Sequence, residues 1–116
     1  MSDAESAPTP THDPEGVDPQ TLTLFQQNIL LVLASTGPQH GLGIKGDLEP
    51  LYGHQDMNHS RVYHALDQLV ERGLLQKSQR DGRTNEYALT PTGRKTLQAD
   101  ASRRVTIVTR MEGRQP

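Results

Sequence analysis

Residues that can hydrogen-bond to nucleic-acid bases gather near the middle of the chain, at positions 58–64. Asn58 is a residue type favoured at helix N-caps, so a helix is expected to begin directly after it. His59, Ser60, Arg61 and His64 then fall in its first two turns. Side chains of these types at the start of a helix can reach base edges in the major groove of DNA. Arg61 is the strongest candidate, because arginine donates two hydrogen bonds to guanine.

Two further residues of the same expected helix are candidates. Gln68 can contact a base edge or a phosphate. Tyr63 can either pack on the domain or bind a phosphate through its hydroxyl, and the sequence leaves both interpretations open. Exposed polar residues on an ordinary amphipathic helix would produce the same pattern. The helix alone therefore does not decide between DNA recognition and a solvated surface.

A second candidate region surrounds the dipeptide Asp-Gly at positions 81–82. Asp-Gly between the strand-like runs 74–80 and 84–89 strongly predicts a β-hairpin. Its tip carries Arg80 and Arg83. Two cations at a hairpin tip are well placed for backbone phosphates or the minor groove. The candidate wing residues are Arg80, Arg83, Thr84 and Asn85.

Weaker candidates for phosphate contact lie at the start of another expected helix. Free backbone N–H groups near Gly43 can bind an anion, and Lys45 adds a positive charge close by. Four apolar residues suggest this helix, Leu42, Ile44, Leu48 and Leu51. Pro50 predicts that it ends near Glu49.

Local signals place the elements that hold these residues. A capping box at Thr23 begins a first helix, which Gly37 and Pro38 end. The helix after Asn58 ends at Gly73. Thr90 is the expected N-cap of a last helix. In the helix after Asn58, four apolar residues are expected to share one face: Val62, Leu66, Leu69 and Val70.

The element order predicts an α+β, mainly α fold: a winged helix-turn-helix with a two-stranded wing and a C-terminal dimerisation helix. The DNA-binding domain is expected over residues 21–90 and the dimerisation helix over 91–112. Residues 1–20, rich in proline and acidic residues, are expected to form a disordered tail, and 113–116 a disordered end.

Composition excludes several classes of protein. The chain has 116 residues and no cysteine, which excludes disulfides, thiolate metal sites and thiol redox sensing. No apolar run is long enough to span a membrane, so we expect a cytoplasmic protein. The net charge is −2, yet residues 57–116 hold eleven basic and six acidic residues. A basic C-terminal half is compatible with double-stranded DNA as the partner.

The chain also suggests a homodimer. Only 32% of the residues are apolar, so a single copy can bury little apolar surface, and a second copy would relieve this shortage. The first and last helices carry the most apolar surface. The expected dimerisation residues are Phe25, Ile29, Leu97, Ala101, Val105 and Val108.

Two other functions remain open at this point. A metal-responsive sensor is conceivable because imidazole and carboxylate ligands occur close together at His54, Asp56, His59 and His64. Their spacing is not a recognised metal motif, and His59 and His64 are five positions apart instead of four. A winged-helix module that binds protein is the other alternative. No nucleophile–base pattern, phosphate loop or carboxylate pair indicates an enzyme or a cofactor.

Four segments carry a family resemblance: residues 41–44, 58–66, 69–75 and 87–93. They are similar to the PadR-like transcriptional regulators, and most of all to their haloarchaeal branch. The resemblance implies a symmetric dimer on a palindromic promoter element, with the third helix in the major groove, the wing at its flank and the last helix in dimerisation. It also implies a role in a stress response. The resemblance does not indicate which effector ligand, if any, the protein binds.

Overall fold

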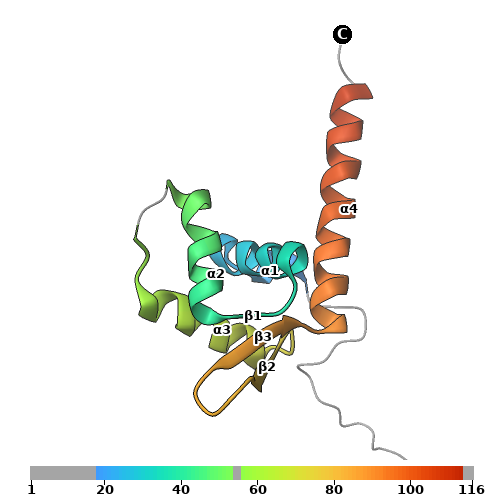
Figure 1. The fold of residues 1–116 in the computed structure, drawn as a ribbon. Coiled ribbons are helices and arrows are strands. Elements are labelled where there is room, and N and C mark those ends of the chain that lie inside the picture. Colours follow the sequence, from blue (N-terminus) through green and yellow to red (C-terminus); the bar gives the residue numbers. More distant parts are fainter. Residues whose placement is uncertain (1–17, 54–55, 114–116) are drawn as a thin grey trace, which may run out of the picture.

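The computed structural model describes residues 18–53 and 56–113. It consists of three helices around a shared core, a small antiparallel sheet and a long fourth helix (Figure 1). The helices are α1 (Leu24–Thr36), α2 (Gly41–Leu48), α3 (His59–Glu71) and α4 (Pro91–Gly113). A winged helix-turn-helix was predicted, and this architecture confirms it. No helix in these two ranges is long and apolar enough to cross a membrane.

Helix α1 begins with the predicted capping box. The Thr23 side chain accepts a hydrogen bond from the N–H of Gln26, whose own side chain accepts one from the N–H of Thr23. Gly37 ends the helix with a φ of 86°, a backbone conformation that favours glycine. The buried face of α1 packs in the core and its opposite face is open. The core residues of α1 are Phe25, Ile29, Leu30, Val32 and Leu33.

Helix α2 ends at Leu48, as expected, and the chain continues in a 3-10 helix, η2 (Glu49–Tyr52). Ile44 and Leu48 are fully buried, whereas Leu42 and Leu51 are more than half exposed. Of the four apolar residues that predicted this helix, Leu42 and Leu51 therefore lie outside the core. The change to 3-10 geometry at Glu49 rotates the following residues away from the face that α2 buries.

Helix α3 begins after Asn58, whose side-chain oxygen accepts a hydrogen bond from the N–H of Arg61 at 3.2 Å. Gly73 follows its end with a φ of 77°. Both signals were predicted. One face of α3 is buried against α1 and α2. Its buried residues are Val62, Ala65, Leu66 and Leu69.

The sheet has a third strand that the sequence did not predict. Strands β2 (Leu75–Gln79) and β3 (Asn85–Leu89) form the expected hairpin. The short strand β1 (Gln39–His40) pairs antiparallel with the other edge of β3. The two-stranded hairpin is as predicted, and β1 extends the sheet at its base. Because β1 leads directly into α2, it fixes the start of α2 beside the hairpin.

The two ends of the described chain depart from the expected disorder. Pro19–Thr21 form a short 3-10 helix, η1, in contact with α4. Arg72, directly after α3, donates hydrogen bonds to the carbonyl and hydroxyl oxygens of Thr21. Gly113 is the last residue of α4. The remainder of the expected tail, residues 1–17, and residues 114–116 lie outside the described residues.

Thr90 joins the sheet to α4. Its hydroxyl donates to the carbonyl oxygen of Gly73 at 2.6 Å and accepts from the N–H of Gly93 at 3.0 Å, as expected of an N-cap. Gly93 is buried, and a Cβ there would collide with the carbonyl oxygen of Leu74. The Thr-x-x-Gly spacing therefore combines a helix cap with a close helix–backbone contact.

Gly93→Ala is expected to lower the free energy of unfolding by about 1–3 kcal/mol, because backbone atoms obstruct the added methyl group. The control is Gly46→Ala in α2, where a Cβ would meet no atom within 4 Å. That substitution should stabilise the protein by about 0.5–1 kcal/mol. Urea denaturation measures both changes. Equal effects of the two substitutions would show that the contact at Gly93 is not tight.

Candidate nucleic-acid interface

The outward face of α3 carries Ser60, His64 and Asp67, all exposed. At about 3.6 residues per turn, these three positions lie opposite the buried face of the helix. Two of them were predicted, and Asp67 was missed. The spacing of four and three residues from Ser60 would have revealed it. A carboxylate on this face can accept a hydrogen bond from cytosine N4, and it repels phosphates.

Arg61 does not point in the same direction as Ser60 and His64. Its guanidinium carbon lies 4.0 Å from the centre of the Phe25 ring and 5.8 Å from that of Tyr52. This is a cation–π arrangement on the flank of α3 that faces α1 and η2.

Two other predicted residues make contacts within the domain. The Gln68 side-chain oxygen accepts a hydrogen bond from the buried side chain of Gln26 at 3.0 Å, which ties α3 to α1. Asn58 caps the helix through its side-chain oxygen. These contacts indicate that both residues hold α3 in place.

His59 and Tyr63 lie on the flank of α3 that faces the start of α2. Their rings stack at 6.1 Å between centres with 14° between planes. The phenol ring of Tyr63 lies against Gly41, where a Cβ would collide with it. Of the two interpretations left open for Tyr63, packing on the domain is therefore observed, and Gly41 is needed for it.

A polar cavity of about 290 Å³ lies between the start of α2, α3 and the hairpin. His40 precedes α2 but its side chain does not cap the helix. The first backbone N–H groups of α2, which include that of Gly43, are thus left without a side-chain cap and beside the hairpin. The cavity is lined by His40, Gly41, Leu42, Tyr63, Arg83, Thr84, Asn85 and Tyr87.

The hairpin tip is held by Asp81. Its carboxylate accepts hydrogen bonds from the N–H groups of Arg83 at 2.9 Å and Thr84 at 3.0 Å, and these bonds hold the pKa of Asp81 below its usual value. Arg80 lies 3.9 Å from Glu86, a long ion pair on the surface. Within the described ranges, the Arg83 side chain makes no ion pair. The Arg83 side chain is exposed at the tip and can reach a phosphate.

Lys45 has a different environment from the one expected. Its ammonium group lies 3.0 Å from Asp56 and 3.3 Å from Glu49, and the hydrogen bond with Asp56 raises the pKa of Lys45. Two carboxylates around one ammonium leave a net negative charge, which disfavours a phosphate. The predicted phosphate contact at Lys45 is corrected to a structural one that joins α2 to the segment before α3.

Comparison with known proteins identifies the chain. The family model described as "Transcriptional regulator PadR-like family" matches residues 29–99. The chain belongs to this family. Accordingly, this PadR-like protein is a winged-helix DNA-binding transcriptional regulator and not an enzyme.

Solved structures of RosR from H. salinarum are similar to this PadR-like chain. In the hsRosR–S4 complex the identity is 45% and the TM-score 0.74, covering 81% of this chain and 79% of that one. The structure of RosR grown from NaBr is 46% identical with a TM-score of 0.72, and the match covers 77% of this chain and 79% of that one. YusO from Bacillus subtilis, 21% identical with a TM-score of 0.69 over 84% of this chain and 65% of that one, shares the fold.

A sequence relative is the uncharacterized 37.1 kDa protein of transposon TN4556 from Streptomyces fradiae. It is 32% identical over 75 residues, which are 65% of this chain. The match spans about a fifth of that protein, 21% of its length.

The predicted dimerisation residues of α1 are corrected. Phe25 is 7% exposed and Ile29 is fully buried, so the core of the single chain already uses both. Their neighbours on the open face of α1, Leu24 and Leu31, are 65% and 53% exposed. Because α1 is apolar on several sides, the sequence pattern did not reveal which side faces the core.

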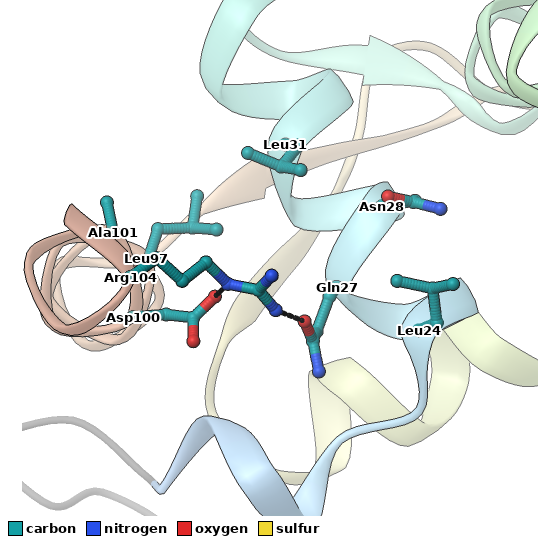
Figure 2. Close-up of a pocket in the computed structure, with 8 residues that line it drawn as sticks. All are labelled: Leu24, Gln27, Asn28, Leu31, Leu97, Asp100, Ala101 and Arg104. Atoms are coloured by element: carbon teal, nitrogen blue, oxygen red, sulfur yellow. Dashed lines mark hydrogen bonds and ion pairs between the residues drawn. The ribbon is translucent and has the colours of Figure 1, made fainter. Parts of the chain in front are cut away.

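A groove between α1 and α4 holds Leu24 and Leu31 together with Leu97 and Ala101 of α4 (Figure 2). Its volume is about 240 Å³. Arg104 crosses it, bonded to the Asp100 carboxylate at 2.8 Å and to the Gln27 side-chain oxygen at 3.3 Å. Burial opposes ionisation of Asp100, but the bonds from Arg104 and Arg103 outweigh it and lower the pKa of Asp100.

Helix α4 extends beyond this groove, and its residues 101–113 are all exposed. In Figure 1 the end of α4 projects away from the rest of the PadR-like domain. The apolar side chains on this exposed part include Val105 and Val108, which were predicted for dimerisation. The full set is Val105, Ile107, Val108 and Met111.

The metal-sensor alternative gains no support from the described residues. Asp56 is paired with Lys45, and His59 stacks on Tyr63. Among residues 18–53 and 56–113, no three His, Asp or Glu side chains are grouped to hold a metal ion. The fourth predicted ligand, His54, lies outside the described residues.

Proposed function

We propose that this PadR-like regulator binds an inverted-repeat promoter site as a homodimer, with α3 in the major groove and the hairpin on the flanking backbone. The observation that carries the proposal is the outward face of α3 beside a hairpin tip that carries Arg80 and Arg83. Both lie at the end of the domain from which α4 points away (Figure 1). This leaves the far part of α4 free to meet a second copy.

The residues divide into two roles. Ser60 and His64 face outward from the first turns of α3, so we assign them to base edges, with Asp67 as a further contact. Arg83, Arg80, Thr84 and Asn85 are assigned to the backbone, together with the N–H groups near Gly43. Hydrogen bonds to phosphate position the protein on DNA without distinguishing one sequence from another. Contacts with base edges determine which DNA sequence is bound.

The homodimer rests on the exposed apolar surface of the two helices. On helix α4, Val105 and Val108 are 64% and 49% exposed within the described part of the chain. Leu24 and Leu31 on α1 replace Phe25 and Ile29 as the second part of the proposed interface. A twofold dimer matches an inverted repeat whose half-sites lie about one helical turn apart. The stress-response role implied by the family resemblance stays a prediction.

The first test is selection of bound sites from a randomised duplex pool, followed by fluorescence anisotropy across salt concentrations. We expect an enriched inverted repeat. His64→Ala should lose about 1–3 kcal/mol of discrimination at one base pair of each half-site. Arg83→Ala should weaken binding to all duplexes alike. The slope of the logarithm of the binding constant against the logarithm of salt concentration should fall by about one for each subunit, as expected for the loss of one phosphate contact.

Arg94→Ala is the matched control, because Arg94 is an exposed arginine of α4 outside the α3–hairpin face. It should change neither the discrimination between base pairs nor the salt dependence of binding. If no sequence is enriched, the proposal of a sequence-specific regulator is wrong, and binding to a protein partner becomes the better explanation of the fold.

A further inference from the structure

Arg61 belongs to a cluster of four residues contributed by three elements. Its guanidinium covers the Phe25 ring of α1 at 4.0 Å and approaches the Tyr52 ring of η2 at 5.8 Å. The two rings contact each other at 5.7 Å with a tilt of 57°. The Tyr52 hydroxyl accepts a hydrogen bond from the Asn28 side chain at 2.9 Å. We call Phe25, Asn28, Tyr52 and Arg61 the Arg61 cluster.

The Arg61 cluster reaches from the start of α3 to the open face of α1. Asn28 lines the groove between α1 and α4, and Figure 2 shows its side chain between those of Leu24 and Leu31. At the other end, the N–H of Arg61 is held by the Asn58 cap. Arg61 is thus fixed through its backbone and through its guanidinium.

The direction of Arg61 separates it from the outward face of α3. Successive residues of a helix differ by about 100°, so Arg61 lies well away from Ser60 in direction and closer to Gln68. Gln68 also bonds to α1, through Gln26. This flank of α3 therefore consists of contacts with α1 and η2, and it leaves the outward face to Ser60 and His64.

We propose that Arg61 is a positioning residue, and not a base contact: through Phe25 and Tyr52 it fixes the start of α3 at the angle that groove reading requires. Consequently, DNA binding depends on Asn28 and Tyr52, which themselves touch no DNA. This inference rests on the proposed function. It replaces the role at guanine that the sequence suggested for Arg61.

The test is a double-mutant cycle, measured as anisotropy of the selected duplex and of all its single-base variants at several salt concentrations. Arg61→Ala and Tyr52→Leu should each weaken binding to the selected duplex by about 3- to 10-fold. The double variant should bind the duplex with about the affinity of the single variant that binds it less tightly, because both changes break the same cluster. The salt dependence should stay as in the wild type.

Other outcomes would overturn the inference. Loss of discrimination at one base pair, with Tyr52→Leu harmless, would make Arg61 a base contact. A salt dependence less steep by about one phosphate would make it a backbone contact. Additive effects of the two substitutions would show that the residues act separately.

A third variant keeps the test decisive if Tyr52→Leu does not fold. Asn28→Ala removes the hydrogen bond to Tyr52 and leaves both rings and Arg61 in place. It should weaken specific binding by about twofold, as expected for one neutral hydrogen bond at the margin of the cluster, and have no added effect in the Arg61→Ala background. An unchanged affinity would count against the inference. Wild-type protein that selects no site would instead refute the proposed function itself.

Discussion

Val108→Asp is expected to turn the protein into a monomer at micromolar concentration and to weaken binding to an inverted repeat by about 100-fold or more. Val108 is 49% exposed in the single chain, on a part of α4 where every residue is exposed. Burying a carboxylate without a partner in an apolar interface is costly. Each monomer then binds one half-site weakly, whereas the dimer binds the full site tightly.

The surface around Val108 has the pattern of a helix–helix seam. Leu97, Ala101, Arg104, Val108 and Met111 follow one another at alternating spacings of four and three residues. The first three line the groove with α1. Val108 and Met111 continue the seam past the end of α1's contact, where a second α4 or the open face of a partner's α1 can cover them.

Thr106→Asp is the matched control for Val108→Asp. Thr106 is exposed on the opposite side of α4, and the substitution introduces the same charge. Sedimentation velocity gives the oligomeric state, and anisotropy with full and half sites gives the affinities. The control should remain dimeric. A dimeric Val108→Asp variant with full affinity would remove α4 from the interface.

Signals within a few residues of each other predicted most of the fold. Thr23, Asn58 and Thr90 cap helices as expected, and Gly73 ends one. These interactions depend on neighbours in the sequence, so a single residue type in the right place is sufficient. The Asp81 turn of the hairpin belongs to the same class.

Contacts between distant residues were the ones that the sequence did not predict. Strand β1 has two residues, Gln39 and His40, which is too short to show an alternating pattern. Lys45 meets Asp56 eleven positions away. The direction of Arg61 depends on the placement of Phe25 and Tyr52. In each case the relevant partner is determined by tertiary packing, which residue types alone do not specify.

Helix α1 gives the sharpest example, because its apolar residues surround the helix. Leu30 and Leu31 are adjacent and identical, yet Leu30 is fully buried and Leu31 is 53% exposed. Sequence periodicity could not assign one to the core and the other to the surface. Only the positions of α2, α3 and α4 around α1 decide it.

Leu30→Ala is therefore expected to lower the free energy of unfolding by about 2–5 kcal/mol, since it leaves a cavity in the core. For a domain of this size that is a large share of the total stability. Leu31→Ala should cost the single chain within about 0.5 kcal/mol, because it changes an exposed residue. Chemical denaturation of the monomeric Val108→Asp background separates these two effects from dimerisation.

The same pair of variants, made in the wild-type background, tests the open face of α1. If Leu31 contributes to the dimer, Leu31→Ala raises the dimer dissociation constant, and its thermal midpoint falls more at low than at high protein concentration. Leu30→Ala should lower the midpoint at all concentrations. A Leu31→Ala variant with unchanged dimer affinity would restrict the interface to α4, because Leu31 is the most central exposed leucine of α1.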